Sequence, residues 1–557
     1  MNTIVRKLLT GAVMAGISLP LSAHAADLDL QQKIENLSKE VEALKQQTKK
    51  AEAKSLSRWL TIGGDYRFRI DSLRGETVGY TDVNKTFAFA QEQMNNGFLN
   101  NPTVFGPQAA AFANFANSMK QVTTYRGAQT FLQNNQAMLQ NFGNFAQQIP
   151  AYKPVNDTLY TTRLGLDLHA KATQNVSVTV RLVAYKTFGS QDDSAVTNSG
   201  STPFFADRVG VFDGTLGHVP SSSYLDVDRA YATWSNIADQ PIWFSVGRRP
   251  STNGAPSNLR LNNERPGNGG TPALLVDYAF DGMTIGWAPD IDSLPGAYAK
   301  ICYGRAFESG LESAGNSLND TDMLGIAVVP VDTDPLRVWL QWNRGFNIFD
   351  FPVMSNTAFG NTRPGVELGD IDWYGAGAMS KLKKVGPGNL NLFGDVALSI
   401  THPNDNVSSN AGFQGLLTGG FFNPEAPTSK TGWAVYVGSR YDYTPTGTKL
   451  GFEYNHGSKD WITFAPAADD MWTAKLGTRG NVYETYLIQE IKLAPISSYF
   501  SKVFFRIGYQ YYDFDYTGSN NWVGAPVKIS DIKSSDMQLL TPLKSAQNIY
   551  GTFEVKF

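Results

Sequence analysis

The sequence is poor in several residue types, and each shortage excludes a class of protein. Its 557 residues include one cysteine, Cys302, and no C-x-x-C-H motif, so an internal disulfide, a cysteine-based metal site and covalently attached haem are excluded. Charged residues make up 17%, against roughly 25% in soluble domains. No stretch reaches the roughly 18 apolar residues that a membrane-spanning helix needs. A charged soluble enzyme and a helical membrane protein are both disfavoured, and we expect no cofactor.

Aromatic residues and alternating segments are abundant instead. Aromatics make up 12% of the chain, and there are 52 glycines. In "DYRFRID", residues 65–71, Tyr66, Phe68 and Ile70 alternate with charged side chains. Strand side chains alternate between two faces, so one face is apolar and the other charged. A soluble sheet would hide the apolar face in a core, whereas a membrane barrel would turn it toward lipid.

The same alternation recurs along the chain, and the links between alternating segments are short and long in turn. Examples are 163–169, 176–182, 433–441, 450–454 and 503–511, and "NIYGTFEVKF" at 548–557 is an amphipathic strand that ends in an aromatic residue. Short turns such as "VGPGN" and long links such as 402–430 and 458–480 follow the rhythm of outer-membrane barrels. The sequence therefore predicts an all-β fold, a transmembrane antiparallel β-barrel of 16 to 18 strands, within residues 57–557.

The N-terminal residues predict export. Arg6 and Lys7 precede a short apolar run, and Ala23-His24-Ala25 fits a cleavage site, so residues 1–25 are predicted to be a signal peptide. Export predicts the bacterial outer membrane as the location. In residues 26–56, the apolar positions Leu30, Ile34, Leu37, Val41 and Leu44 form a heptad seam. We expect a periplasmic coiled-coil helix, or alternatively a single amphipathic helix on the barrel rim.

Residues 73–157 lack alternation and are rich in Ala, Phe, Asn and Gln. Phe112, Phe115 and Met119 recur at helical spacing, as do Phe131, Met138 and Phe142. This pattern predicts a helical insert of two or three helices after the first strand, serving as a loop, a cap or a plug. A disordered low-complexity loop remains the alternative.

Arginines are the candidate pore-lining groups, because fixed charges at the narrowest point select which ions pass. The Gly/Pro-rich loop 250–271 is predicted to fold into the lumen and to place charges of both signs there. Alternatively, the arginines pair with carboxylates such as Asp226 and Asp228 and only brace the wall. The pore-lining candidates are Arg67, Arg69, Arg163, Arg181, Arg248, Arg249, Arg260, Glu264 and Arg265.

Signals for catalysis, metal binding and nucleic acid are weak. His169, His218, His402 and His456 are scattered, with no H-E-x-x-H, G-x-S-x-G or P-loop motif. We expect no enzyme activity. The Asp-rich stretches "VDTDP" and "NDTD" are more typical of solvated turns than of Ca²⁺ sites. The net charge is −3 for the whole chain, which does not indicate a nucleic-acid partner.

Two further blocks carry a family resemblance. They are "LDVDRAYATW" and "VGRRPSTNGAPSNLRLNNERPGNGGTPALLVDYAFDGMTIGWAP". With the segment order above, the chain resembles a family of porin-like outer-membrane channel proteins of anaerobic, metal-reducing bacteria. The resemblance implies a channel with a link to extracellular electron transfer.

The expected function is passive diffusion of small hydrophilic solutes and ions, with anion preference. The alternative is a barrel scaffold or sleeve for multihaem cytochromes, or a surface structural protein. The expected partners are outer-membrane lipid and further copies of the chain, a trimer being favoured over a dimer.

Overall fold

The structure, a computed structural model, describes residues 59–189, 218, 222–251, 254–263, 265–266, 272–313, 316–350, 354–357, 360–465, 470–492 and 501–557. The predicted signal peptide (1–25) and coiled-coil helix (26–56) lie outside the described residues. The description below concerns residues 62–557, which form one compact unit.

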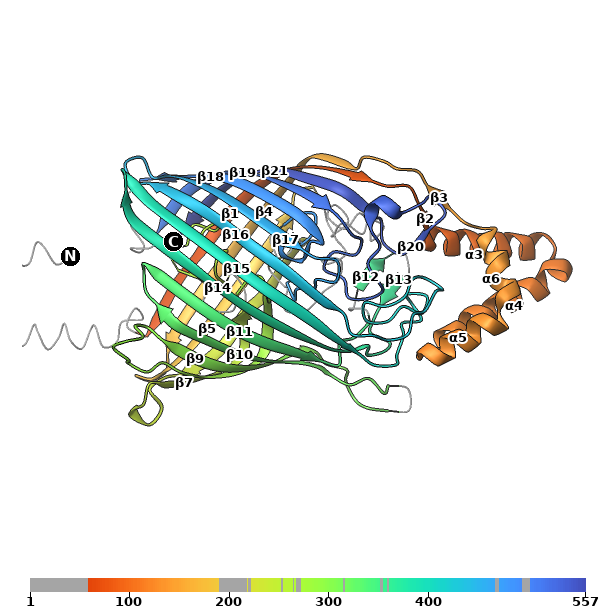
Figure 1. The fold of residues 1–557 in the computed structure, drawn as a ribbon, viewed down its shortest axis with the longest axis horizontal. Helices are drawn as coiled ribbons and strands as arrows, with labels where there is room; N and C mark the ends of the chain where they lie inside the picture. Colours follow the sequence, from red (N-terminus) through yellow and green to blue (C-terminus); the bar gives the residue numbers. More distant parts are fainter. Residues whose placement is uncertain are drawn as a thin grey trace, which may run out of the picture. The chain divides into compact units, whose positions relative to one another are not determined.

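Sixteen strands close into an antiparallel barrel (Figure 1). The prediction of a barrel is confirmed, at the lower of the two expected strand counts. The barrel strands are β1 (Leu60–Thr77), β4 (Val155–Lys171), β5 (Val176–Thr187), β6 (Ser222–Trp234), β7 (Ile242–Ser251), β8 (Tyr278–Trp287), β9 (Tyr298–Phe307), β10 (Thr321–Asp332), β11 (Leu336–Phe346), β14 (Gly369–Val385), β15 (Gly388–Pro403), β16 (Thr431–Tyr443), β17 (Thr448–Gly457), β18 (Gly480–Ile491), β19 (Lys502–Phe514) and β21 (Leu543–Lys556).

The barrel closes where the two ends of the chain meet. β1 pairs with β21 from Asp65–Lys556 to Thr77–Leu543, and the Gly64 N–H donates to the Phe557 carbonyl at 2.8 Å. The opening strand and the amphipathic carboxyl-terminal strand are therefore neighbours. We call the end of the barrel that carries Phe557 and the short links 172–175, 333–335, 386–387 and 444–447 the turn end, and the opposite end the loop end.

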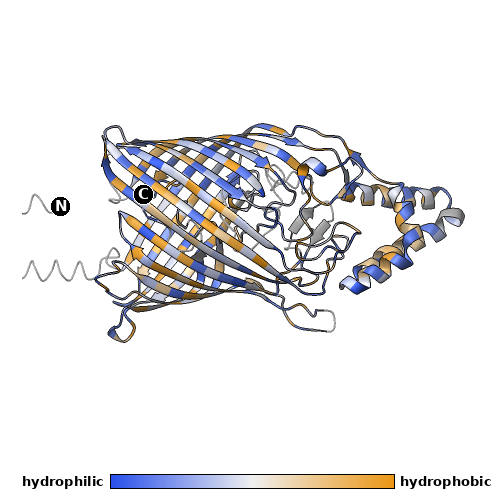
Figure 2. Ribbon diagram, in the orientation of Figure 1, coloured by the Kyte–Doolittle hydropathy of each residue, from blue (hydrophilic) through white to orange (hydrophobic). Residues whose placement is uncertain are grey.

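The outer surface of the barrel is apolar, because the residues that alternate along each strand place their apolar side chains on the outer face. Leu164 on β4 and Phe505 on β19 are 49% and 47% exposed. By contrast, Arg506, the next residue on β19, and Arg67 on β1 face inward and are each 2% exposed. In Figure 2, hydrophobic residues alternate with hydrophilic ones along the barrel strands. A closed barrel satisfies its backbone hydrogen bonds internally, which a lipid environment requires. The stripe predicted from Tyr66, Phe68 and Ile70 thus faces outward.

Aromatic side chains are exposed near both ends of the outer surface. Trp234, Trp287 and Tyr443 end strands at the turn end, while Trp433 and Tyr483 begin strands at the loop end. Amphipathic rings favour the two membrane–water interfaces, and barrels carry girdles of them. This arrangement marks out the apolar band between the two rings as the lipid-facing part.

The link between β1 and β4 is helical, as predicted, but it is shorter than 73–157. Since β1 runs to Thr77 and β4 begins at Val155, both predicted boundaries lay inside strands. The described part forms four helices rather than two or three: α3 (Val83–Asn100), α4 (Pro102–Lys120), α5 (Tyr125–Asn134) and α6 (Gln136–Gly143). Asp82 and Thr124 cap α3 and α5 by accepting from backbone N–H groups, as good N-cap residues do. In the described part of the chain no helix has the length and apolarity to cross a membrane.

These helices stand beyond the loop end in Figure 1. Phe115 and Phe131 pack against Val407 and Phe413 of the β15–β16 loop, and the Tyr125 N–H donates to the Asp405 carbonyl at 2.8 Å. Of the three roles expected for the insert, a plug inside the lumen does not match these contacts.

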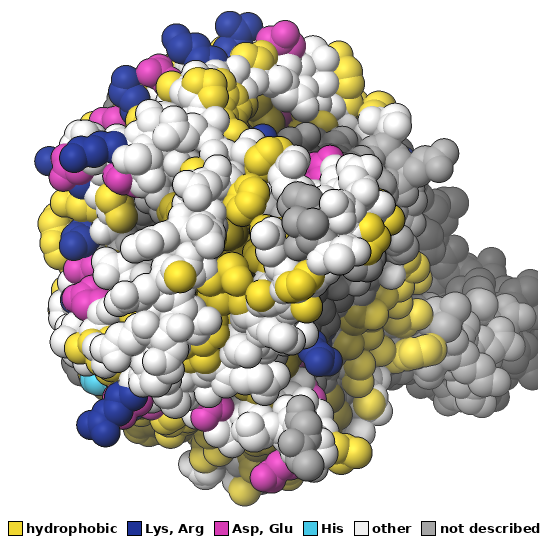
Figure 3. Space-filling view, turned by 90° about the vertical axis from the view of Figure 1, so that its right-hand side faces the viewer, with side chains coloured by type: hydrophobic (Ala, Val, Ile, Leu, Met, Phe, Trp, Pro, Cys, Tyr) yellow, Lys and Arg dark blue, Asp and Glu magenta, His cyan; other side chains and the backbone are white. Residues whose placement is uncertain are grey.

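The remaining elements lie in the loops. They are the strands β2 (Tyr80–Asp82), β3 (Gln148–Ile149), β12 (Met354–Thr357), β13 (Gly360–Thr362) and β20 (Met537–Gln538), and the short 3-10 helices Ile237–Asp239, Lys475–Gly477 and Ile529–Asp531. β20, β2 and β3 form a small sheet of their own. Viewed from the loop end, hydrophobic side chains gather among the loops in the middle of the face, and charged ones gather toward one margin (Figure 3).

Candidate functional site

The lumen contains two loops that enter it from the loop end. One is the β7–β8 loop, residues 252–277, and the other is the β17–β18 loop, residues 458–479. The described residues of both are almost all buried. The β7–β8 loop reaches the turn end, because Lys556 Nζ donates to the Leu261 carbonyl at 2.9 Å and to the Asn263 side chain at 2.6 Å.

Charged side chains hold the two loops to each other and to the barrel wall. Arg260 contacts Asp470 at 2.9 Å and Glu484 of β18 at 3.1 Å. Lys475 contacts the same Glu484 at 2.6 Å and also pairs with Glu453 of β17. We call these five residues the plug cluster. Each is buried, so together they tie both loops to the β17–β18 wall.

Further hydrogen bonds surround the plug cluster. Tyr550 of β21 donates to Glu484 at 2.7 Å, and Gln510 of β19 donates to Asp470 at 2.7 Å. Arg440 and Arg506 donate to the backbone carbonyls of Leu259 and Arg260, at 2.5 and 2.7 Å. Each of the strands β16 to β19 and β21 therefore donates to, or pairs with, a residue of the β7–β8 loop.

The electrostatics of the two loop residues agree with this geometry. Burial acts to raise the pKa of Asp470, but the charges of Arg260 and Lys475 outweigh it and hold the pKa below its usual range. Burial acts to lower the pKa of Arg260, but the carboxylates of Glu484 and Asp470 raise it well above its ordinary value. Both groups are therefore ionised at neutral pH, as a stable buried ion pair requires.

An apolar layer inside the barrel lies next to the plug cluster. The Phe464 N–H donates to the Leu275 carbonyl at 3.0 Å, and the Asp277 N–H donates to the Phe464 carbonyl at 2.9 Å. The indole of Trp373, on β14, donates to the Ile462 carbonyl at 2.9 Å. Leu275, Trp373 and Phe464 belong to one buried hydrophobic cluster, so the two loops form a small core within the lumen.

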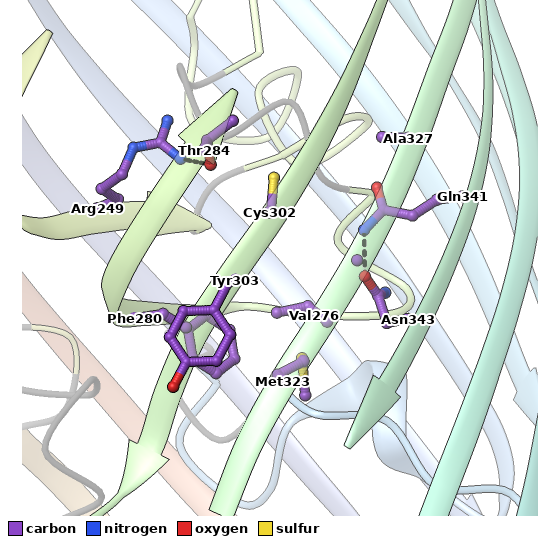
Figure 4. Close-up of a pocket in the computed structure, with 12 residues that line it drawn as sticks. Arg249, Val276, Phe280, Thr284, Cys302, Tyr303, Met323, Ala327, Gln341 and Asn343 are labelled. Atoms are coloured by element: carbon purple, nitrogen blue, oxygen red, sulfur yellow. Dashed lines mark hydrogen bonds between the residues drawn. The ribbon is translucent and has the colours of Figure 1, made fainter. Parts of the chain in front are cut away.

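The opposite wall, β7 to β11, is not filled in the same way. A cavity lies there between the wall and the end of the β7–β8 loop (Figure 4). We call it the side cavity. Its lining includes Arg249, Phe280, Thr284, Cys302, Gln341 and Asn343.

Two amides in the side cavity pair with each other and leave groups over. Gln341 Nε2 donates to Asn343 Oδ1 at 2.9 Å, while Gln341 Oε1 and Asn343 Nδ2 are buried without a hydrogen-bond partner. A Cβ at Gly325, opposite Asn343, would lie 2.5 Å from that Oδ1, so a larger residue there would displace the Asn343 amide. The cavity thus presents one free acceptor and one free donor.

Arg249 enters the side cavity from β7. It donates to the hydroxyls of Ser245, at 2.8 Å, and Thr284. The Cys302 thiol is close enough to interact with it. No carboxylate contacts Arg249 within the described residues.

Four of the predicted arginines lie on the inward faces of β1, β4 and β5. Arg67 donates to the Tyr185 hydroxyl at 2.8 Å, and Arg69 pairs with Asp71 at 2.7 Å. Arg163 contacts Asp65 at 3.3 Å. Their contacts favour the bracing interpretation.

Arg181 has carboxylate partners on three other strands. It contacts Asp65, Asp167 at 2.6 Å and Asp228 at 3.2 Å. Asp228, named from the sequence as an arginine partner, also pairs with Arg229 and His218. Arg181 therefore links β1, β4, β5 and β6.

The other predicted residues fall in different places. Arg248 shares the outward face of β7 with Val246 and pairs with Asp281 at 3.1 Å, so it is not a lumen group, because neighbouring strand residues point to opposite faces. Arg265 is 64% exposed and lies 3.7 Å from Asp334. Arg249 lines the side cavity and Arg260 is in the plug cluster. Glu264 lies outside the described residues.

Sequence reasoning missed the β17–β18 loop and the amides of the side cavity. One signal was present for the loop: "DWITF" and "MW" place large apolar residues within a long link, which a solvated loop would not favour. The amides at Gln341 and Asn343 carried no signal beyond ordinary alternation. No group of three metal-ligating residues is found in the described ranges.

Residues 153–557, most of the chain, match a family model described as "Protein of unknown function (DUF3373)". The chain belongs to this family. No curated protein matches it.

Solved outer-membrane proteins resemble the chain at low identity. An anion-selective porin from Comamonas acidovorans has 11% identity, covers 89% of this chain and 99% of its own, and gives a TM-score of 0.37. OprB of Pseudomonas putida has 9% identity, with 90% and 95% covered and a TM-score of 0.40. OmpF of Salmonella typhi has 8% identity, with 89% and 97% covered and a TM-score of 0.38. Likenesses this remote concern the barrel architecture alone.

Proposed function

We propose that the protein is a porin-like channel of the bacterial outer membrane that passes small hydrophilic solutes and prefers anions. Its lipid-facing band and closed barrel support a membrane location. The short links would then face the periplasm and the long loops the outside, as in bacterial barrels.

The observation that carries this proposal is the uneven filling of the lumen. The β7–β8 loop is held by buried charges on one side, against β16 to β19 and β21. On the other side Ala255 packs against Val329 and Trp339, and the side cavity remains beside this contact, against β7 to β11. A loop that narrows a barrel to one side creates a constriction whose charges select ions. The passage we propose runs along the β7–β11 wall.

The charges along that wall support anion preference. Arg249 lines the side cavity, and Lys300 and Arg337 project from the inward faces of β9 and β11. Arg337 pairs with Asp332 at 3.5 Å, which offsets its charge. Arg249 contacts hydroxyls and a thiol and lies over the Tyr231 ring, and no carboxylate contacts it among the described residues. A positive constriction raises the local concentration of anions.

Reconstitution in a planar bilayer tests the proposal. We expect discrete single-channel steps, of small conductance because two loops occupy the lumen. In a potassium chloride gradient, the reversal potential should be shifted from zero toward the equilibrium potential of chloride. A protein that inserts, shown by protection of its strands from protease, but gives no conductance would contradict the channel.

The filled lumen also supports a second candidate function. A barrel with a hydrophobic core inside it suits a rigid outer-membrane scaffold, for example a dock for multihaem cytochromes, whereas a sleeve around a cytochrome would need the lumen that the two loops occupy. In that case no conductance is expected, and a cytochrome should co-purify with the intact barrel.

We further propose that the barrel acts as a homo-oligomer, with a trimer favoured over a dimer. The mass of the detergent-solubilised full chain, measured by light scattering with the detergent subtracted, distinguishes the two.

A further inference from the structure

The side cavity has the chemical features of a ligand site as well as of a passage. Three observations meet there: a guanidinium facing hydroxyls and a thiol, an amide pair with a buried free acceptor and a buried free donor, and an apolar surface. Unpartnered buried polar groups cost free energy, about 1–3 kcal/mol each, unless a ligand or water satisfies them. Where such groups border a cavity, a ligand that enters it can satisfy them.

The charge of the lining favours an anion. Among the residues that line the cavity, Arg249 is charged and none is Asp or Glu. Its guanidinium has more N–H donors than the hydroxyls of Ser245 and Thr284 use. A planar guanidinium with donors to spare suits a carboxylate, which can accept two parallel hydrogen bonds.

The rest of the lining favours an organic anion over an inorganic one. Val276, Phe280 and Met323 present apolar surface to the cavity. A phosphate or sulfate ion would gain nothing from these contacts, whereas the carbon chain of an organic acid would be removed from water against them. Gln341 Oε1 can accept from a hydroxyl of such a ligand, and Asn343 Nδ2 can donate to it.

We propose that the side cavity is a binding site for small organic carboxylates, with the carboxylate on Arg249 and a hydroxyl on the Gln341–Asn343 amide pair. This inference rests on the proposed function, because it names the solute class that the passage would favour. It identifies Arg249 and the amide pair as the specificity-determining groups.

The single cysteine makes the site directly measurable. Cys302 lines the cavity, is partly exposed and is the chain's one thiol, so any thiol label on the protein reports this place. The refolded full chain, held at constant ionic strength, is treated with an anionic and with a cationic methanethiosulfonate reagent. Because Arg249 is positively charged, we expect the anionic reagent to react about tenfold faster. This ratio corresponds to a difference of roughly 1.4 kcal/mol.

Ligands are then tested as protectants against the anionic reagent. Lactate should slow the labelling most, acetate less, and phosphate and the neutral solute glycerol little. In Arg249→Gln, the preference for the anionic reagent and the protection by lactate should both be lost. Arg248→Gln is the matched control, because Arg248 is the adjacent residue on the outward face, and it should behave as the unchanged protein.

The outcomes separate the site from the channel. Equal protection by phosphate and lactate, or no protection by either, would overturn the site. Lactate protection that persists in Arg249→Gln would also overturn it. Because labelling needs no conduction, protection without single-channel steps keeps the site and refutes the channel, while steps without protection do the reverse. Unchanged migration of the unheated barrel on a gel shows that each variant has folded.

Discussion

The wall formed by β16 to β19 and β21 and the wall formed by β7 to β11 both turn polar side chains toward the lumen, but different things face them. Against the first wall lie Arg260, Asp470 and Lys475 of the inward loops. Arg260 pairs with Asp470 and Glu484, and Lys475 pairs with Glu453 and Glu484. Against the second wall lies the side cavity. Unpartnered polar atoms occur on both walls, but those of Gln341 and Asn343 belong to residues that line this cavity.

This difference shows how a barrel can be both blocked and selective. Buried charges are stable only when they are paired, so the matched wall holds the loops in place. A guanidinium without a carboxylate partner, and amides with unpartnered atoms, can interact with solutes, so the unmatched wall can select them. The same β7–β8 loop creates both conditions, because its buried ion pairs lie on one side while its contacts with β10 and β11 leave the side cavity open.

The largest expected effect comes from breaking the matched side. In Arg260→Ala, Asp470 and Glu484 lose a buried cation, and removing one partner of a buried pair typically costs about 3–5 kcal/mol. The β7–β8 loop should detach from β18, and single-channel conductance should rise several-fold. Faster proteolysis of the loop should accompany the rise.

Arg74→Ala is the control for this prediction. Arg74 pairs with Asp157 at 3.2 Å, but both side chains are more than half exposed, so the pair contributes little. Its conductance should equal that of the unchanged protein. An Arg260→Ala barrel that stays folded with unchanged conductance would show that the loop is held by its apolar contacts instead.

A smaller effect on the same side is expected from acid. Because the pKa of Asp470 is lowered in the folded protein, its ionisation stabilises the fold above its unfolded pKa, about 3.9. That contribution is lost as the pH falls through the lower, folded pKa. The groups facing Asp470 are Arg260, Lys475, Glu484 and Gln510.

We therefore expect the conductance to rise below about pH 4. In Asp470→Asn the tie is already weakened at neutral pH, so the starting conductance should be higher and the acid response smaller. If the conductance of Asp470→Asn rises in acid as much as that of the unchanged protein, a titratable group other than Asp470 causes the rise.

The fold could be predicted from the sequence much more fully than the site. Period-two alternation reports which face of a strand is apolar, and the prediction of a membrane barrel then places that face, with residues such as Leu164 and Phe505, on the outside. The inward direction of loop 250–271 followed from its length and composition. Its partners Asp470 and Glu484 are more than 200 residues away in sequence, and nothing local records such a contact.

Individual arginines show the same limit. Arg248 and Arg249 are adjacent and chemically identical, yet strand alternation places one outside and the other in the cavity. Arg181 and Arg249 both lie on inward faces, but Arg181 meets three aspartates and Arg249 meets hydroxyls and a thiol. The role of an inward arginine depends on which strands become its neighbours, and only the closed barrel determines that.

On the unmatched side, Arg249→Gln should change selectivity without releasing the loop. The substitution keeps polar character and removes the charge, so the reversal potential in a salt gradient should move toward zero while the conductance stays within about twofold. Arg248→Gln should leave both quantities unchanged. A large rise in conductance for Arg249→Gln would mean that this wall also holds the loop, and the contrast between the two walls would fail.

The smallest effect is expected at the amide pair. Gln341→Leu has a similar volume and removes the free acceptor, but it also leaves Asn343 Oδ1 without its donor, so the stability should change by no more than about 1–3 kcal/mol. Ion selectivity depends on charge and should not change. In the unchanged channel, added lactate should reduce the current more than added acetate, because the lactate hydroxyl contacts the amide pair. In Gln341→Leu this difference between the two solutes should disappear. If Gln341→Leu still distinguishes lactate from acetate, the hydroxyl binds elsewhere on the β7–β11 wall, and Asn343→Leu is the next variant to measure.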